Sequence, residues 1–215
     1  MKIPYNVERT LRRYSISNLM TYIVAAMAAV YVIDLVLPIN LYSYMMLTRS
    51  GILSGQIWRL VSFVALPPNA SLLWIIFSLY FYWMIGTTLE NQWGTFKFNL
   101  FYLVGTIGSI IACMITGYAD NYYLNMSLFL AFAALNPNFQ LMLFFIIPIK
   151  VKYIALLDVV LFVYSFIVGG WSARATIIVA LANIWLFLGG DFINTIRRES
   201  SYWKTRYNFR KNMRG

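Results

Sequence analysis

The sequence predicts an all-α integral membrane protein, a bundle of about six transmembrane helices with both termini on the cytoplasmic side. Hydrophobic residues make up 61% of the 215 residues and charged residues only 11%, which is far from the composition of a water-soluble domain. Several apolar runs approach the ~20 residues that a helix needs to cross a bilayer. The basic residues are concentrated in the segments that flank these runs, a pattern typical of membrane orientation.

The apolar runs divide the chain into a cytoplasmic N-terminal segment (1–16), a transmembrane domain (17–196) and a basic cytoplasmic tail (197–215). The predicted helices run from Ser17 to Pro38, Ser71 to Glu90, Phe96 to Gly117, Tyr122 to Asn136, Lys150 to Val168 and Ala173 to Ile196. The first indicates a retained helix rather than a cleaved signal peptide, because several runs of similar quality follow it. The fourth is short for a span, because Pro137 lies between two asparagines that stop the helix.

Two connections contain too many apolar residues for solvated loops. We expect residues 39–70 to fold against the helices, because backbone polar groups at membrane depth must be satisfied by protein or by water. The stretch from Phe139 to Ile149 has two interpretations. It is either an interfacial or inward-lying segment, or an extension of the fourth helix past a kink.

The orientation follows from the lysines and arginines. With the N-terminus inside, about 14 of the 17 basic residues are cytoplasmic, and only Arg49, Arg59 and Arg174 are outside. An odd number of helices would destroy this bias, because the tail and the N-terminus would lie on opposite sides. The net charge of +10 therefore indicates membrane orientation and contact of the tail with anionic lipid, and we expect no nucleic-acid partner.

The reactive side chains are few. The chain has one cysteine, Cys113, inside an apolar run, and no histidine. A single cysteine forms no intramolecular disulfide, and its position is typical of packing. We expect no cofactor and no bound metal.

The most informative segment runs from Gly55 to Gly105. It contains Gly-Gln-Ile-Trp58-Arg59-Leu, then Gly86-Thr-Thr-Leu-Glu90, then Trp93-Gly94. These motifs together resemble the rhomboid superfamily, in which a loop Trp-Arg precedes the second helix and a Gly-x-x-Leu-Glu closes it. The resemblance covers about Trp58 to Asp191. It implies a rhomboid-like six-helix bundle in which these residues hold the loop and the second helix in place.

The same residues also have simpler interpretations. Trp58 is typical of an interfacial anchor. We expect Arg59, in an apolar loop, to have a fixed partner, either backbone carbonyls or Glu90.

The rhomboid resemblance also allows a test for catalysis. Active rhomboids share a Ser–His dyad. The serine lies in a Gly-x-Ser-Gly motif that opens the fourth helix, and the histidine lies in an Ala-His pair in the sixth. Here Asn183 follows Ala182 where the family has the dyad histidine, and an amide does not accept a serine proton near pH 7. Ser127 is the best counterpart of the nucleophile, but Leu128 follows it in place of the small glycine.

The groups that stabilise the oxyanion are also replaced. Counting back from Glu90, Trp74 falls at the family's oxyanion-binding histidine and Ser78 at its oxyanion-binding asparagine. Loss of one such donor costs about 10²–10³ in rate. Lys150 and Lys152 lie on the opposite side of the membrane and do not replace the base. We therefore expect no catalytic residue and no protease activity.

Three functions are compatible with these features. The first is a rhomboid-like pseudoprotease that binds transmembrane segments of client proteins, as a chaperone or adaptor in membrane protein quality control. Asn136-Pro-Asn138 is also similar to Derlin patterns, although Derlins commonly keep a histidine where Asn183 stands. The second is a rhomboid intramembrane serine protease with a degenerate site.

The third function is a transporter or channel subunit that uses Asp158, because an intramembrane carboxylate is by default a functional-site hypothesis. A protonated or hydrogen-bonded packing residue explains Asp158 equally well. For localisation, the short tail without a partner-recruiting motif favours the bacterial cell membrane over the endoplasmic reticulum.

Overall fold

The structure is a computed structural model that describes residues 15–37, 39–68, 71–143 and 147–188. Within these ranges, five helices are long and apolar enough to cross a membrane: α2 (Leu19–Val36), α6 (Leu72–Trp93), α7 (Thr95–Thr116), α9 (Val151–Val168) and the helix Trp171–Leu188. The protein is therefore a mainly α-helical, multi-pass membrane protein. The predicted N-terminal segment up to residue 14, the end of the last predicted helix and the basic tail lie outside the described residues.

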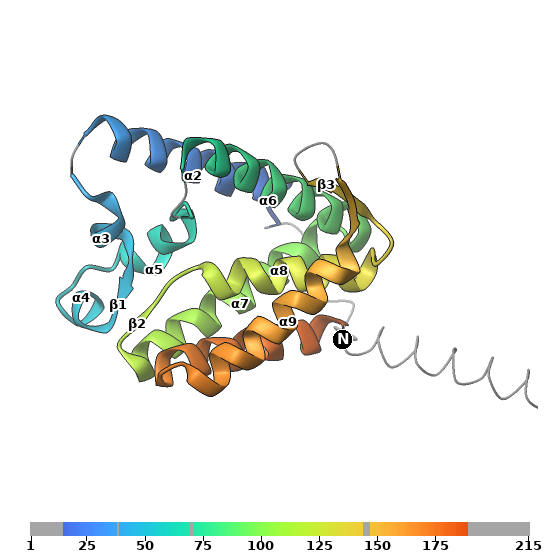
Figure 1. The fold of residues 1–215 in the computed structure, drawn as a ribbon. Helices are drawn as coiled ribbons and strands as arrows, with labels where there is room; N and C mark the ends of the chain where they lie inside the picture. The colour runs from blue at the N-terminus through green and yellow to red at the C-terminus, as the bar shows by residue number, and fades with distance from the viewer. Residues whose placement is uncertain (1–14, 38, 69–70, 144–146, 189–215) are drawn as a thin grey trace, which may run out of the picture.

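The fourth predicted span forms the short helix α8 (Tyr122–Leu135). Its 14 residues rise about 21 Å, which is less than the ~30 Å of a hydrocarbon core. Nine of them are buried, and α8 contacts α6, α7 and α9, so that it lies inside the bundle (Figure 1). The prediction of a short fourth helix that stops at Asn136 is confirmed.

A hairpin replaces the predicted apolar segment after α8. Strands β3 (Gln140–Leu143) and β4 (Ile147–Lys150) pair antiparallel, with Gln140 opposite Lys150. The alternative of a continued α8 is therefore wrong. Pro137 disfavours helical backbone at Asn136, and Pro148, which has no N–H, is tolerated in a two-stranded hairpin.

The connection between α2 and α6 is a folded unit. It consists of α3 (Leu41–Met45), β1 (Leu47–Thr48), α4 (Arg49–Leu53), α5 (Arg59–Ser62) and the 3-10 turn η1 (Phe63–Ala65). Strand β1 pairs with β2 (Tyr118–Ala119), which follows α7. The amide of Asn121 donates to the carbonyl oxygens of Val64 (3.0 Å) and Leu66 (2.8 Å). The prediction that this connection folds against the helices is confirmed.

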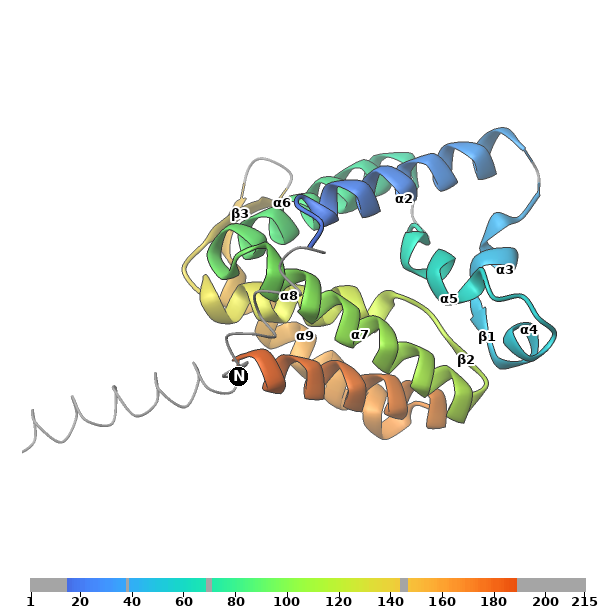
Figure 2. The same ribbon diagram turned by 180° about the vertical axis from the view of Figure 1, so that it is seen from behind.

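Small residues set the spacing between helices. A Cβ on Gly86 of α6 would lie 2.3 Å from Cγ of Met20 on α2, and a Cβ on Gly108 of α7 would lie 2.3 Å from Cγ1 of Val179. Figure 2 shows the helix Trp171–Leu188, which carries Val179, running along α7. The helix backbones approach this closely because glycine has no side chain.

Candidate functional site

Ser127, the predicted counterpart of a nucleophile, lies in the middle of α8. Its side chain is 0% exposed. Its hydroxyl donates a 2.7 Å hydrogen bond to the carbonyl oxygen of Leu124, one turn back on the same helix. A serine in a membrane helix commonly satisfies its hydroxyl in this way. Ser127 is therefore a packed, internally bonded side chain in this structure.

Asn183, the counterpart of the dyad histidine, is 2% exposed on the helix Trp171–Leu188. Its amide nitrogen donates to the carbonyl oxygen of Phe101 on α7 (3.2 Å), and its side-chain oxygen is buried without a hydrogen-bond partner. A Cβ on Gly105 would lie 2.8 Å from this nitrogen and 2.4 Å from Cδ1 of Leu124. Asn183 and the first turns of α8 therefore meet at Gly105.

The positions predicted as a degenerate dyad thus lie in one region, but they do not interact as a dyad does. Among the described residues, no hydrogen bond joins the side chains of Ser127 and Asn183. The Ser127 hydroxyl is directed to its own helix and the Asn183 amide to α7. Serine catalysis needs a base within hydrogen-bond reach of the nucleophile, and Ser127 and Asn183 do not provide this geometry.

The predicted oxyanion positions are less buried than Ser127 and Asn183. Trp74 is 46% exposed in the first turn of α6, and its ring meets that of Phe77 edge to face at 6.3 Å. Ser78, about one turn further along α6, is partly buried. The oxyanion positions at Trp74 and Ser78 were predicted from sequence spacing alone. In the structure, Trp74 lies at the surface of the bundle.

Arg59 organises the connection between α2 and α6. The residue is 8% exposed, and its Nη1 donates to the carbonyl oxygens of Ser43 (2.9 Å) and Met46 (2.6 Å). Its Nε donates to Oε1 of Gln56 (2.5 Å). The predicted partnership with backbone carbonyls is confirmed, and the alternative partner Glu90 is wrong. A Cβ on Gly51 would lie 2.7 Å from Nε, so glycine is required where the guanidinium crosses the backbone.

Trp58, the neighbour of Arg59, lies at the surface. Its side chain is more than half exposed, and its indole Nε1 donates a long hydrogen bond of 3.4 Å to the carbonyl oxygen of Tyr44. An exposed indole with one hydrogen bond is typical of an anchor between apolar and polar surroundings.

Glu90 fixes the start of α2. Its Oε1 accepts a 2.9 Å hydrogen bond from the backbone N–H of Asn18, a residue with the left-handed φ of 56°. Its Oε2 is buried without a hydrogen-bond partner. The Gly86–Glu90 motif therefore joins α6 to α2 twice, through the close contact of Gly86 with Met20 and through this hydrogen bond.

The Trp93-Gly94 pair forms the turn between α6 and α7. Gly94 has a φ of 81°, which favours glycine. Trp93 packs against Phe101 at 5.4 Å and Phe187 at 6.4 Å between ring centroids, and Nζ of Lys97 lies 5.3 Å from its ring. This aromatic cluster joins the end of α6 to α7 and to the helix Trp171–Leu188.

Asp158 is buried on α9, on the same face as Phe162, which packs against Tyr123 of α8. In the part of the chain that the structure describes, no ion pair is formed with Asp158. The residue is therefore on the α8-facing side of α9.

Sequence reasoning missed two asparagines that join distant segments. Besides Asn121, Asn99 of α7 accepts a hydrogen bond from the N–H of Ile16 (3.2 Å) and donates to the Ile16 carbonyl oxygen (2.9 Å). For Asn99, the available signal was an amide side chain in an otherwise apolar helix, which needs a partner in a membrane.

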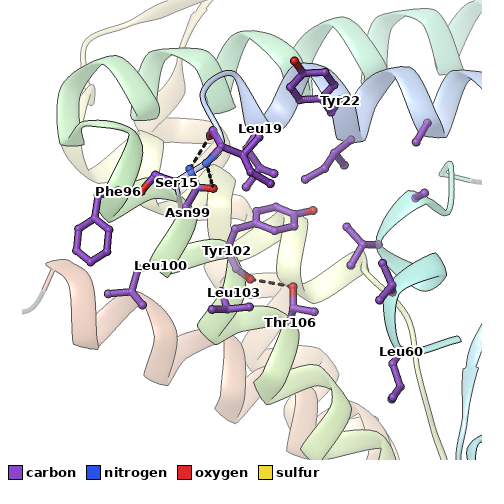
Figure 3. A pocket seen from close by; sticks show the side chains of 16 residues that line it. Ser15, Leu19, Tyr22, Leu60, Phe96, Asn99, Leu100, Tyr102, Leu103 and Thr106 are labelled. Carbon is purple, nitrogen blue, oxygen red and sulfur yellow. Dashed lines mark hydrogen bonds between the residues drawn. The ribbon is translucent and has the colours of Figure 1, made fainter. Parts of the chain in front are cut away.

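A cavity of about 620 Å³ lies between α2, the α5–η1 segment and α7 (Figure 3). Ile23, Val64, Tyr102 and Leu103 are among its lining residues, whereas Trp74, Ser78, Ser127 and Asn183 are not. The cavity is thus separate from the predicted degenerate site.

No group of three or more His, Cys, Asp or Glu side chains able to hold a metal ion occurs among the described residues. In comparisons with known proteins, no family model matches the chain, and no curated protein matches it. The functional interpretation therefore depends on the geometry of the chain itself.

Proposed function

We propose that the chain is a non-catalytic rhomboid-like membrane protein, a pseudoprotease that binds transmembrane segments of client proteins in membrane protein quality control. The proposal includes the six-helix bundle with both termini in the cytoplasm, in which α8 and the helix Trp171–Leu188 are the fourth and sixth helices. It favours the bacterial cell membrane.

The observation that carries the proposal is the environment of Ser127 and Asn183. Ser127 donates its hydroxyl to Leu124, and Asn183 donates its amide to Phe101. Neither interaction activates a nucleophile, because neither partner is a base that takes the serine proton. Under this proposal the two residues occupy the positions of a lost hydrolase dyad, and their contacts are those of a packed core.

The retained scaffold supports the rhomboid part of the proposal. Arg59 holds the connection between α2 and α6 through backbone carbonyls, and Glu90 joins α6 to α2. These are positioning roles, as the resemblance implies. If catalysis is lost while these contacts are kept, the folded bundle has a function other than catalysis.

Client binding is supported by the outward faces of α6 and α9. Large apolar side chains are more than half exposed along both helices: Leu72, Leu73, Ile76 and Tyr80 on α6, and Leu156, Val160, Val163 and Ile167 on α9. Such faces contact lipid in the absence of a partner. A transmembrane helix packs on them by exchanging lipid contacts for helix contacts.

A protease assay in liposomes tests the non-catalytic part. Wild type, Asn183→His and Ser127→Ala are incubated with a permissive rhomboid substrate and, in parallel, with a serine-directed fluorophosphonate probe. We expect no cleavage and no labelling of any variant, because Asn183→His supplies a base but leaves Ser127 closed in by Leu128 and without oxyanion donors. Wild-type cleavage that disappears in Ser127→Ala would establish the degenerate protease instead.

Client binding needs its own measurement. Photo-crosslinking residues at Leu73 on α6 and at Val160 on α9 should capture single-span membrane proteins in native membranes, whereas the same residue at the buried Phe132 should not. Crosslinks to lipid alone from both helices would contradict the proposal. Transport through Asp158 is not proposed, because Asp158 faces α8 and does not line the cavity.

A further inference from the structure

The cavity between α2, the α5–η1 segment and α7 is apolar and bounded at both ends. At one end, the two hydrogen bonds between Asn99 and Ile16 tie α2 to α7. At the other, Leu60, Val61 and Val64 of the α5–η1 segment line it. None of its lining residues carries a formal charge, so the cavity suits an uncharged occupant.

Tyr102 contributes to this cavity a buried polar group without a hydrogen-bond partner. Its side chain is 4% exposed, and its hydroxyl is buried without a hydrogen-bond partner. Figure 3 shows its ring extending from α7 toward α2, and its carbonyl oxygen accepting a hydrogen bond from Thr106 (2.8 Å). Buried hydroxyls in proteins are normally hydrogen-bonded, and a membrane provides no water as a substitute.

We infer that this cavity binds a neutral lipid, a molecule with an apolar body and one hydrogen-bonding oxygen that pairs with the Tyr102 hydroxyl. The volume fits such a molecule, because ligand pockets are about 300–1,000 Å³. Water is a poor occupant, because the lining is mainly apolar and offers few of the hydrogen-bond partners that a buried water needs.

A complete transmembrane helix is too long for the cavity. The lining residues of α7 extend from Phe96 to Thr106, which is about 15 Å along the helix. A transmembrane helix of ~20 residues is about 30 Å long, so the cavity covers only about half of its length. The site is therefore distinct from the proposed client surfaces on α6 and α9, and the inference does not depend on them.

A phospholipid does not provide a hydrogen-bond partner for the Tyr102 hydroxyl. Tyr102 lies seven residues after Thr95, the first residue of α7, and is therefore about 10 Å along a membrane-spanning helix. Phospholipid headgroups stay at the interface, and the acyl chains that reach this depth have no hydrogen-bonding atom. An alcohol or carbonyl oxygen of a neutral lipid reaches this depth because its body is apolar and it has no charge to solvate.

The test compares two probes that differ by one oxygen, hexadecanol and hexadecane. The full-length protein is placed in phospholipid nanodiscs, and binding of radiolabelled hexadecanol is measured with hexadecane or phosphatidylglycerol as competitor. We expect hexadecanol to bind about fivefold or more tightly than hexadecane, because only the alcohol satisfies the hydroxyl. Phosphatidylglycerol should compete weakly.

Three variants assign the site. Tyr102→Phe keeps the ring and should remove the preference for the alcohol, whereas Tyr164→Phe, on the exposed face of α9, should leave it unchanged. Ala26→Trp fills the cavity and should abolish saturable binding. The melting behaviour of this variant reports whether it folds. If it does not fold, Tyr102→Phe remains the decisive variant. Equal binding of both probes to wild type, or an unchanged preference in Tyr102→Phe, would overturn the inference. Efficient competition by phosphatidylglycerol would overturn it in favour of an acyl-chain site.

Discussion

The carboxylate of Glu90, near the end of α6, accepts a hydrogen bond from the backbone N–H of Asn18, just before α2. This bond joins two segments 72 residues apart in the chain. We expect Glu90→Ala to lower the free energy of unfolding by about 1–3 kcal/mol, because it leaves the Asn18 amide without its acceptor. Glu90→Gln keeps an acceptor oxygen and should cost less. Thermal melting in detergent distinguishes the two, and equal losses would contradict a role of the hydrogen bond.

Arg59→Ala should reduce stability strongly. The substitution removes the donor for the Ser43 and Met46 carbonyl oxygens, and hydrogen bonds from charged donors contribute about 1.5–3 kcal/mol each. We expect a loss of roughly 2–4 kcal/mol and less folded protein in the membrane. Arg49→Ala, at an exposed position of α4, is the matched control. Similar expression and melting of the two variants would show that the Arg59 contacts do not stabilise the fold.

Gly108 and Val179 provide a test of how α7 meets the last described helix. Gly108→Ala places a methyl group 2.3 Å from Cγ1 of Val179 and should destabilise the protein by about 1–3 kcal/mol. In the double variant with Val179→Ala the nearest side-chain atom is Cβ, 3.6 Å away, so the loss should be largely reversed. Gly170→Ala, with open space around it, should be neutral. Additive effects in the double variant would contradict the contact.

Asp120 gives a pH dependence outside the membrane-spanning helices. Burial raises the pKa of Asp120 above its ordinary value of 3.8, and burial together with the Asp120 charge raises the pKa of nearby Tyr42. Because the folded state favours the protonated acid, the stability that this proton provides is present at low pH and is lost as the pH rises through the raised pKa.

The matched variant for this prediction is Asp120→Asn, which keeps an oxygen to accept the hydrogen bond from the Tyr122 N–H. We expect its melting temperature to exceed that of wild type by a margin that grows as the pH is raised from about 4 to about 7. A constant difference across this range would exclude Asp120 as the titrating group.

The proposed topology predicts the side on which each end of the chain is found. A reporter that is active only outside the cytoplasm should be inactive when fused after Gly215 and active when inserted between Ser54 and Gly55, because the positive-inside rule puts the tail inside and this connection outside. The reverse pattern would refute the orientation. Activity at both positions would indicate an even number of spans between them.

The sequence predicts the helices of this protein well because membrane burial requires long apolar runs. The described part of each predicted helix agrees with the structure to within a few residues, as for Ser71 to Glu90 against Leu72–Trp93. The hairpin after α8 was not predicted. Its strands contain continuous apolar residues, so the alternation that identifies a half-buried strand is absent.

Side-chain partners were predictable only where the chain offers few choices. Arg59 lies in an apolar loop, and carbonyl oxygens of that loop were among its expected acceptors. The pairing of Asn183 with Phe101, or of Asn99 with Ile16, depends on how each helix is rotated and tilted against its neighbours. Hydropathy contains little information on rotation, because helices such as α2 and α9 are apolar on nearly every side.

The pairing of β1 with β2 also has a consequence for biosynthesis. Leu47 is opposite Ala119, so the connection that contains β1 completes its contacts only after a further 72 residues have been synthesised. At about 5–20 residues per second, this delay is on the order of 4–14 s. During that time α2 and α6 are already available for insertion, while Leu47 and Phe63 lack their final neighbours at α7. A ribosome-bound chain that ends before Tyr118 should therefore expose this connection to protease, and one long enough for Tyr118 to Asn121 to have left the ribosome should protect it.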